Sequence, residues 1–161
     1  MSATVTHPDV ATTTLMQLLA DDSELMNIEV EIRGEPKKIQ DVHYMKIQQE
    51  VTNPYPAIIV NQPITHDFDT NKSPNGPQEI PIADFIQTIR FAVREVEPRD
   101  SQLLAMRARG LAVLIGKTIT IGAEWICSFT FYDWMPDLRG DKGKGLYSEI
   151  GFKLLGCVSR I

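Results

Sequence analysis

The sequence contains few of the residues that build metal and thiol chemistry. Of its 161 residues, two are cysteines and three are histidines. Cys127 and Cys157 form no CxxC pair and have no pair of histidines nearby, which argues against a zinc site. Each cysteine lies in a segment that alternates like a strand, and the two are expected to face different layers. We therefore expect no disulfide and reduced thiols, as is usual inside cells.

Long apolar runs and basic clusters are also missing. No stretch approaches the roughly 20 apolar residues of a membrane-spanning helix, and the first residues lack the basic start and apolar core of a signal peptide. The net charge is -5, with 21 acidic and 16 basic residues. This balance disfavours a general nucleic-acid-binding protein, because neutralising phosphates needs clustered Lys and Arg. Acids dominate the N-terminal part and arginines the middle, which is compatible with stacked copies or, more simply, with two solvated faces.

Recognisable catalytic motifs are absent as well. His66, Asp67 and Asp69 are the one metal-like cluster, but a catalytic metal site usually takes three protein ligands and no second histidine lies nearby. A polar loop is the simpler interpretation. No serine or cysteine occupies a GxSxG-type turn, and the glycines and lysines at 140–145 lack the spacing of a phosphate-binding loop. The sequence therefore predicts no catalytic residue, no cofactor and no metal site.

The most informative stretch runs from Asp84 to Gly116. Residues 85–96 alternate in the period-2 pattern of a strand with one face on a core. Asp100 or Ser101 can cap a following helix, and Gly116 stands where a C-terminal glycine is favoured. The helical stripe expected to pack on the sheet consists of Leu104, Ala108, Leu111, Ala112 and Ile115.

The rest of the chain adds a helix at about 8–20 and further strands. Alternating or apolar segments predict strands at 28–32, 55–60, 118–121, 125–132 and 146–158, whereas 37–51 reads as irregular or as a short helix. Two polar stretches rich in Gly or Pro, about 61–83 and 133–145, are predicted to be long loops. We find no repeat. Residues 1–161 are therefore expected to form a single α+β domain, a mainly antiparallel sheet with an N-terminal helix and a central helix packed on it.

The order of these segments matches a family pattern over nearly the full chain. A helix of the type Leu15 to Leu25 opens the chain, a strand entered at Tyr55-Pro56 follows, and then come the strand–helix unit of residues 85–115 and strands to the C-terminus. In this order and character the chain resembles the tail terminator and neck (head-tail completion) proteins of tailed bacteriophages. The two long loops are not part of the match, so the terminator, an adjacent neck ring and a tail-tube subunit all stay open.

The resemblance implies a non-enzymatic structural protein of the virion, assembled in the host cytoplasm. Members of this family form a ring, commonly a hexamer, at the junction of head and tail. The ring ends the tail tube and contacts a head adaptor on one side and tail-tube or sheath proteins on the other. DNA only passes through its lumen, for which the excess of acids is a plausible lining. Neither a cofactor nor a membrane contact is implied.

Contacts within such a ring are expected from the two loops and from the basic face of the central helix. The representatives are Asp67, Asp69, Arg107, Arg109, Trp134, Arg139 and Lys142. For any one of them a solvated surface side chain is the simpler interpretation, and Trp134 is as well placed for a site under its loop as for an exposed interface anchor. Two alternatives stay open: a monomeric adaptor that binds a peptide at a sheet edge, and a small metal-dependent enzyme that uses His66, Asp67 and Asp69.

Overall fold

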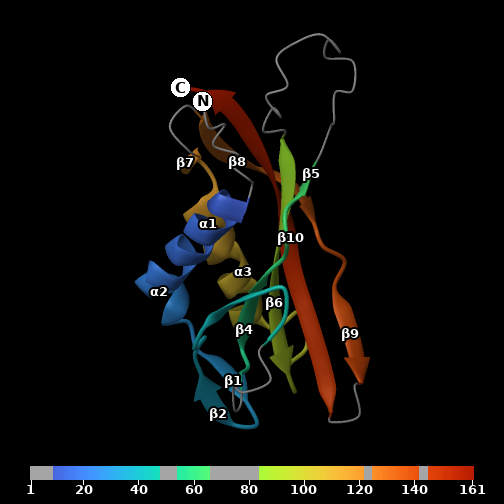
Figure 1. The fold of residues 1–161 in the computed structure, drawn as a ribbon. Coiled ribbons are helices and arrows are strands. Elements are labelled where there is room, and N and C mark those ends of the chain that lie inside the picture. Colours follow the sequence, from blue (N-terminus) through green and yellow to red (C-terminus); the bar gives the residue numbers. More distant parts are fainter. Residues whose placement is uncertain (1–8, 48–53, 66–83, 122–124, 142–144) are drawn as a thin grey trace.

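The computed structural model describes residues 9–47, 54–65, 84–121, 125–141 and 145–161. In these residues, helices cover one face of a curled, mainly antiparallel sheet (Figure 1). The helices are α1 (Asp9–Asp21), α2 (Ser23–Met26) and α3 (Ser101–Leu114). The strands are β1 (Val30–Ile32), β2 (Glu35–Lys37), β3 (Val42–Tyr44), β4 (Ala57–Val60), β5 (Ile64–Thr65), β6 (Phe85–Arg94), β7 (Thr118–Ile121), β8 (Trp125–Trp134), β9 (Leu138–Asp141) and β10 (Leu146–Arg160). This architecture confirms the expected α+β class.

The sheet is built on the long central pair β6 and β10. In the described chain its order is β3-β4-β6-β10-β8-β7, and only β3 and β4 run parallel. β5 continues the line of β4 along β6, and β9 continues the line of β8 along β10. β3 and β5 therefore lie at one edge of the sheet, and β8 and β9 lie toward the other. A separate hairpin, β1–β2, turns at Arg33 and Gly34, which both have positive φ.

The alternation of β6 separates two faces, as its sequence predicts. Phe85, Gln87, Ile89, Phe91 and Val93 are all buried beneath the helices. Gln87, the one polar residue of this set, has a hydrogen-bond partner inside the core: the buried hydroxyl of Thr12 on α1 donates to Gln87 Oε1 at 2.8 Å. The sheet face opposite the helices, called the open face below, carries the intervening residues of β6 and their partners on β10.

Helix α3 begins and ends as expected but buries a different stripe. Asp100 accepts hydrogen bonds from the backbone of residues 102 and 103, and Gly116 adopts φ +77° after the last turn. The buried residues are Leu103, Met106, Gly110, Val113 and Leu114, so the predicted stripe was wrong. The reason is a close approach: a Cβ on Gly110 would lie 2.6 Å from Cζ of Phe91. The face of α3 that carries Gly110 packs on the sheet. Of the predicted stripe, Leu104 and Leu111 lie beside this face and are partly buried against the core, whereas Ile115 is exposed.

Two other segments also differ from the expectation. The ambiguous range 37–51 contains strand β3, which pairs in parallel with β4. The second predicted loop, 133–145, is largely extended: β8 reaches Trp134, and Leu138–Asp141 form β9. Polar, glycine-rich sequence becomes strand here because β10 is long enough to hydrogen-bond both β8 and β9. In the first predicted loop β5 is a short strand, and residues 66–83 lie outside the described chain.

Candidate functional site

Exposed large hydrophobic side chains gather at the two opposite edges of the sheet. In the described residues they are Tyr44, Met45, Ile64, Ile115, Phe131, Tyr132, Trp134, Leu138 and Ile161. All except Ile161 lie on or beside a strand edge. Scattered single hydrophobic residues on a surface are ordinary, whereas grouped ones mark interaction sites.

The first group, called the β8 edge, consists of Ile115, Phe131, Tyr132, Trp134 and Leu138. β7 pairs only with residues 125–128 of β8, so the outer side of residues 129–134 has no strand beside it in the described chain. The C-terminus of α3 lies close by, because the backbone N–H of Gly116 donates to the carbonyl of Phe129 at 3.3 Å. Ile115, the last residue of the predicted α3 stripe, is exposed and thus adds apolar surface beside an open strand.

Trp134 is held in place at the β8 edge without being buried. Its ring lies 4.8 Å from that of Phe131, centroid to centroid, and the guanidinium carbon of Arg107 lies 4.5 Å from the Trp134 ring centroid. Arg107 in turn pairs with Asp137 at 3.8 Å. The tryptophan nevertheless remains 45% exposed. An aromatic side chain that is both ordered and exposed suits an interface anchor, because little conformational entropy remains to be lost on binding.

The second group, called the β3 edge, consists of Tyr44, Met45 and Ile64. β3 pairs only with β4, and β5 pairs with β6, so both present an outer side to which no described strand pairs. Met45 has φ +68°, and its carbonyl accepts a hydrogen bond from Arg90 at 3.0 Å. Ile64 is 66% exposed. The sequence analysis did not single out any of these residues.

The remaining predicted contact residues divide into two classes. Arg109 forms ion pairs with Asp22 and Glu24, and therefore joins α3 to α2 within the subunit. Arg139 pairs with Glu97 at 3.0 Å, with both side chains exposed. Three further predicted residues lie outside the described residues: Asp67, Asp69 and Lys142. His66, of the suggested metal cluster, also lies outside them.

An ion-pair network lies on the open face beside the β3 edge. Nη1 of Arg90 contacts both carboxylate oxygens of Glu149 at 3.1 Å, and its Nε donates to Asn61 Oδ1 at 2.9 Å. The hydroxyl of Tyr147 donates to Glu149 Oε2 at 2.7 Å. Burial, and then this hydrogen bond, raise the pKa of Tyr147. The charge of Glu149 is therefore satisfied by Arg90 and Tyr147.

Arg94 lies on the same face of β6, four residues after Arg90, and has no carboxylate partner in the described residues. Its guanidinium carbon lies 5.4 Å from the ring centroid of Tyr55 and 5.6 Å from that of Tyr147. Its Nη1 is buried and has no hydrogen-bond partner in the described structure. A buried donor without an acceptor costs about 1–3 kcal/mol, so this group requires an explanation. Arg94, Arg90 and Lys46 line a shallow pocket of about 260 Å³.

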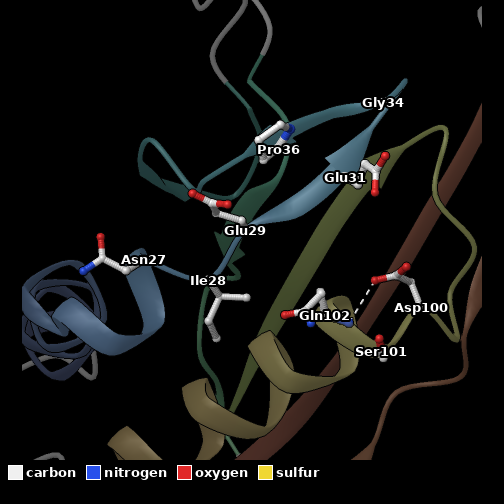
Figure 2. Close-up of a pocket in the computed structure, with 9 residues that line it drawn as sticks. All are labelled: Asn27, Ile28, Glu29, Glu31, Gly34, Pro36, Asp100, Ser101 and Gln102. Carbon is white, nitrogen blue, oxygen red and sulfur yellow. Dashed lines mark hydrogen bonds between the residues drawn. The ribbon is translucent and has the colours of Figure 1, made fainter.

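A larger groove of about 790 Å³ separates the β1–β2 hairpin from the N-terminus of α3 (Figure 2). Glu29 and Asp100 lie on opposite sides of it in Figure 2, and Asp100 is occupied as the cap of α3. The described residues contain no group of three or more His, Cys, Asp or Glu that could hold a metal ion. The groove therefore offers carboxylates that do not converge on a common point.

The part of the chain that the structure describes has no helix long and apolar enough to cross a membrane. No protein-family model, no curated protein and no solved structure matches the chain. The functional assignment therefore rests on the sequence pattern and on the two edges and the pocket described above.

Sequence reasoning found the β8 edge in part and missed the rest. Trp134 was selected for its residue type and its position after a strand. Arg94 carried a weaker signal: it is the last basic residue of an alternating strand that already holds Arg90. Its tyrosine neighbours come from residues 55 and 147, so only the fold brings the three together.

Proposed function

We propose that this chain is a ring-forming structural subunit of a tailed bacteriophage, the tail terminator or an adjacent ring of the neck. The observation that carries the proposal is the pair of apolar, open strand edges on opposite sides of one sheet. An open edge readily pairs with another chain, and a monomeric protein normally blunts such edges with charge.

The two edges differ from each other, which favours a head-to-tail assembly. A two-fold dimer would bury the same patch on both copies. Joining the β8 edge of one copy to the β3 edge of the next leaves one free edge at each end of the assembly, so the same contact can repeat. Such heterologous contacts close into a ring when the rotation between copies divides a full turn. The resemblance to terminator and neck proteins favours a ring of six around passing DNA.

The same placement favours a structural role over catalysis. The two hydrophobic edges are surfaces suited to protein contact. The charged groups of Arg90 and Glu149 pair with each other and are therefore not free to act on a substrate. Under this proposal the subunit needs no cofactor, its partners are further copies and the adjoining neck, tail-tube or sheath proteins, and its location is the virion. The monomeric adaptor that binds a peptide at one edge is the main alternative, because either edge alone would serve it.

Two single-edge variants test the assembly. Leu138→Glu places a charge on the β8 edge, and Ile64→Glu places one on the β3 edge. Each variant keeps one edge intact, so each alone is expected to be monomeric in native mass spectrometry and light scattering, whereas the wild type forms a discrete ring. Mixing the two variants restores one good contact and is expected to give a dimer that grows no further.

Ile161→Glu is the matched control, because Ile161 is exposed and apolar but lies at neither edge. It should assemble like the wild type. A two-fold dimer through the β8 edge would instead leave Ile64→Glu dimeric on its own. A wild-type chain that is monomeric at every concentration would contradict self-assembly and favour the adaptor. Electron microscopy of assembled wild type then distinguishes a ring with a central channel from an open filament.

A further inference from the structure

Among the described residues, Arg94 is a cation of the open face whose buried Nη1 has no hydrogen-bond partner. Arginine carries five N–H donors, and no ion pair of Arg94 is found in the described residues; its guanidinium carbon lies over the faces of Tyr55 and Tyr147. The carboxylate of Glu149, on the same face of the sheet, already accepts hydrogen bonds from Arg90 and Tyr147. Two tyrosine rings thus hold the guanidinium in one place while its charge is left unpaired.

The surroundings of Arg94 favour an anionic ligand with an apolar stem. Three cationic side chains, Lys46, Arg90 and Arg94, line the pocket. Its other walls include Ile47 and Ile59, which belong to a small hydrophobic cluster separate from the main core. At about 260 Å³ the pocket accommodates a single side chain rather than a large ligand. A planar carboxylate matches the guanidinium fork, and the methylene groups of Asp or Glu match the apolar walls.

We propose that this pocket binds a carboxylate, and that in the assembled ring the carboxylate belongs to an acidic side chain of the adjacent copy. The second part rests on the proposed ring function. The pocket borders the β3 edge, because Met45 belongs to both. When two sheet edges pair, their faces continue from one copy to the next. An acid on the open face near the β8 edge is thereby brought to the face of the sheet on which the pocket opens, and the exposed side of the pocket at Met45 and Lys46 is the part it meets first.

Asp133 is the acid in that position. Its register partner on β10 is Lys153, which places it on the open face, and it directly precedes Trp134 of the β8 edge. Its side chain is exposed, and Oδ1 accepts from the backbone N–H of Trp134 at 2.8 Å. Oδ2 remains available for Arg94 of the next copy. Asp137, the other nearby acid, is already paired with Arg107.

The first experiment tests the pocket without the ring. In the Leu138→Glu variant, which keeps the β3 edge and is expected to be monomeric, sodium acetate is titrated against sodium chloride at equal ionic strength. The NMR signal of the Arg94 Nε–H is expected to shift with acetate, and the signal of Arg160 to stay. Arg160 is the control because it also lies over an aromatic ring, Trp125, at the other end of β10. No shift, or a shift with phosphate alone, would overturn the carboxylate pocket.

The second experiment tests the source of the carboxylate in the assembling chain. Arg94→Glu and Asp133→Lys should each raise the concentration needed for half-assembly by roughly tenfold or more, as expected for a desolvated charge pair. The double variant should recover much of that loss. Arg94→Lys keeps the charge and should lose less than Arg94→Gln, and circular dichroism melting confirms that each variant folds.

The outcomes separate this inference from the ring itself. A ring that forms equally well with Arg94→Gln overturns the role of Arg94 and leaves the proposed function standing. Acetate binding by a chain that never self-associates keeps the pocket, but overturns both the ring and the adjacent copy as source. Loss of assembly in both single variants without recovery in the double variant overturns the pairing with Asp133.

Discussion

The guanidinium of Arg109 on α3 forms a bidentate ion pair with the carboxylate of Asp22, through two hydrogen bonds. Nε lies 2.9 Å from Oδ2 and Nη2 lies 2.8 Å from Oδ1. The same carboxylate caps α2, because the backbone N–H of Leu25 donates to Oδ2 at 2.9 Å. One side chain therefore both starts a short helix and ties it to the central helix. Arg109, and to a smaller extent the cap, hold the pKa of Asp22 below its ordinary value despite partial burial.

Removing Asp22 should cost more than removing an exposed ion pair. Asp22→Ala is expected to lower the free energy of unfolding by about 1–2 kcal/mol, since both the cap and the pair are lost. Glu24→Gln, which affects the exposed partner of the same arginine, should cost less than about 0.5 kcal/mol. Urea denaturation of Asp22→Ala, Arg109→Gln and the double variant measures the interaction free energy between Asp22 and Arg109. Strictly additive losses would contradict the bidentate contact.

Stability should fall at acid pH partly through Asp22. A carboxyl whose pKa is lower in the folded state than its ordinary 3.8 binds fewer protons when folded. Its contribution is therefore fully present above that ordinary value and disappears as the pH falls through the lowered folded value. Asp22→Asn should show a shallower loss of stability below about pH 4 than the wild type. Equal acid slopes for the two proteins would exclude this contribution.

Gly110 should tolerate no methyl group, although it lies inside a helix. Alanine ordinarily stabilises a helix relative to glycine by about 1 kcal/mol. Here its Cβ would lie 2.6 Å from the buried ring of Phe91, so Gly110→Ala is expected to destabilise the protein by about 1–3 kcal/mol. Thermal melting shows whether Gly110→Ala is less or more stable than the wild type. Ala112→Gly, at an exposed position of the same helix, reports the propensity alone, and a stabilised Gly110→Ala would show that α3 can move off the sheet.

Tyr147 should make the protein sensitive to alkali. Its pKa is raised from 10.0, first by burial and then by the bond to Glu149, so the folded state holds the proton more tightly than the unfolded one. Stability from this group is complete below pH 10 and is lost as the pH rises beyond it. Tyr147→Phe should lose about 1–2 kcal/mol at neutral pH and decline less steeply in alkali. Urea denaturation of the two proteins across pH measures both slopes, and equal slopes in alkali would contradict the raised pKa of Tyr147.

The two cysteines should react at very different rates. Cys127 is fully buried, and burial raises the pKa of its thiol to about 12, so thiolate is scarce at pH 8. Cys157 is half-buried and faces the open side, because its register partner is Ser128 while Cys127 pairs with Val158. Ellman's reagent should modify one thiol in the native state and the second only in denaturant. Cys157→Ser should remove the fast phase, and two fast thiols in the wild type would contradict this placement.

Local signals in the sequence predicted much of the fold. The alternation of β6, the cap at Asp100 and the glycine at 116 were found correctly, because each depends on side chains within a few positions. The opposite placement of Cys127 and Cys157 followed from the same period-2 argument. For the interface, Trp134 was selected for its residue type and its expected position after a strand; in the structure it is the last residue of β8 and is 45% exposed.

Contacts between distant residues decided the rest. The buried stripe of α3 depends on Gly110 meeting Phe91, and hydrophobicity alone pointed to the neighbouring stripe. The second predicted loop became β9 because β10 supplies its hydrogen bonds. The position of the Arg94 guanidinium depends on two tyrosine rings that come from other segments of the chain. The sequence by itself thus determined the elements and their ends, since these depend on backbone propensity and periodicity. Only the tertiary structure decided which faces remain exposed and which charge remains unpaired, because burial and charge pairing depend on residues far apart in the chain.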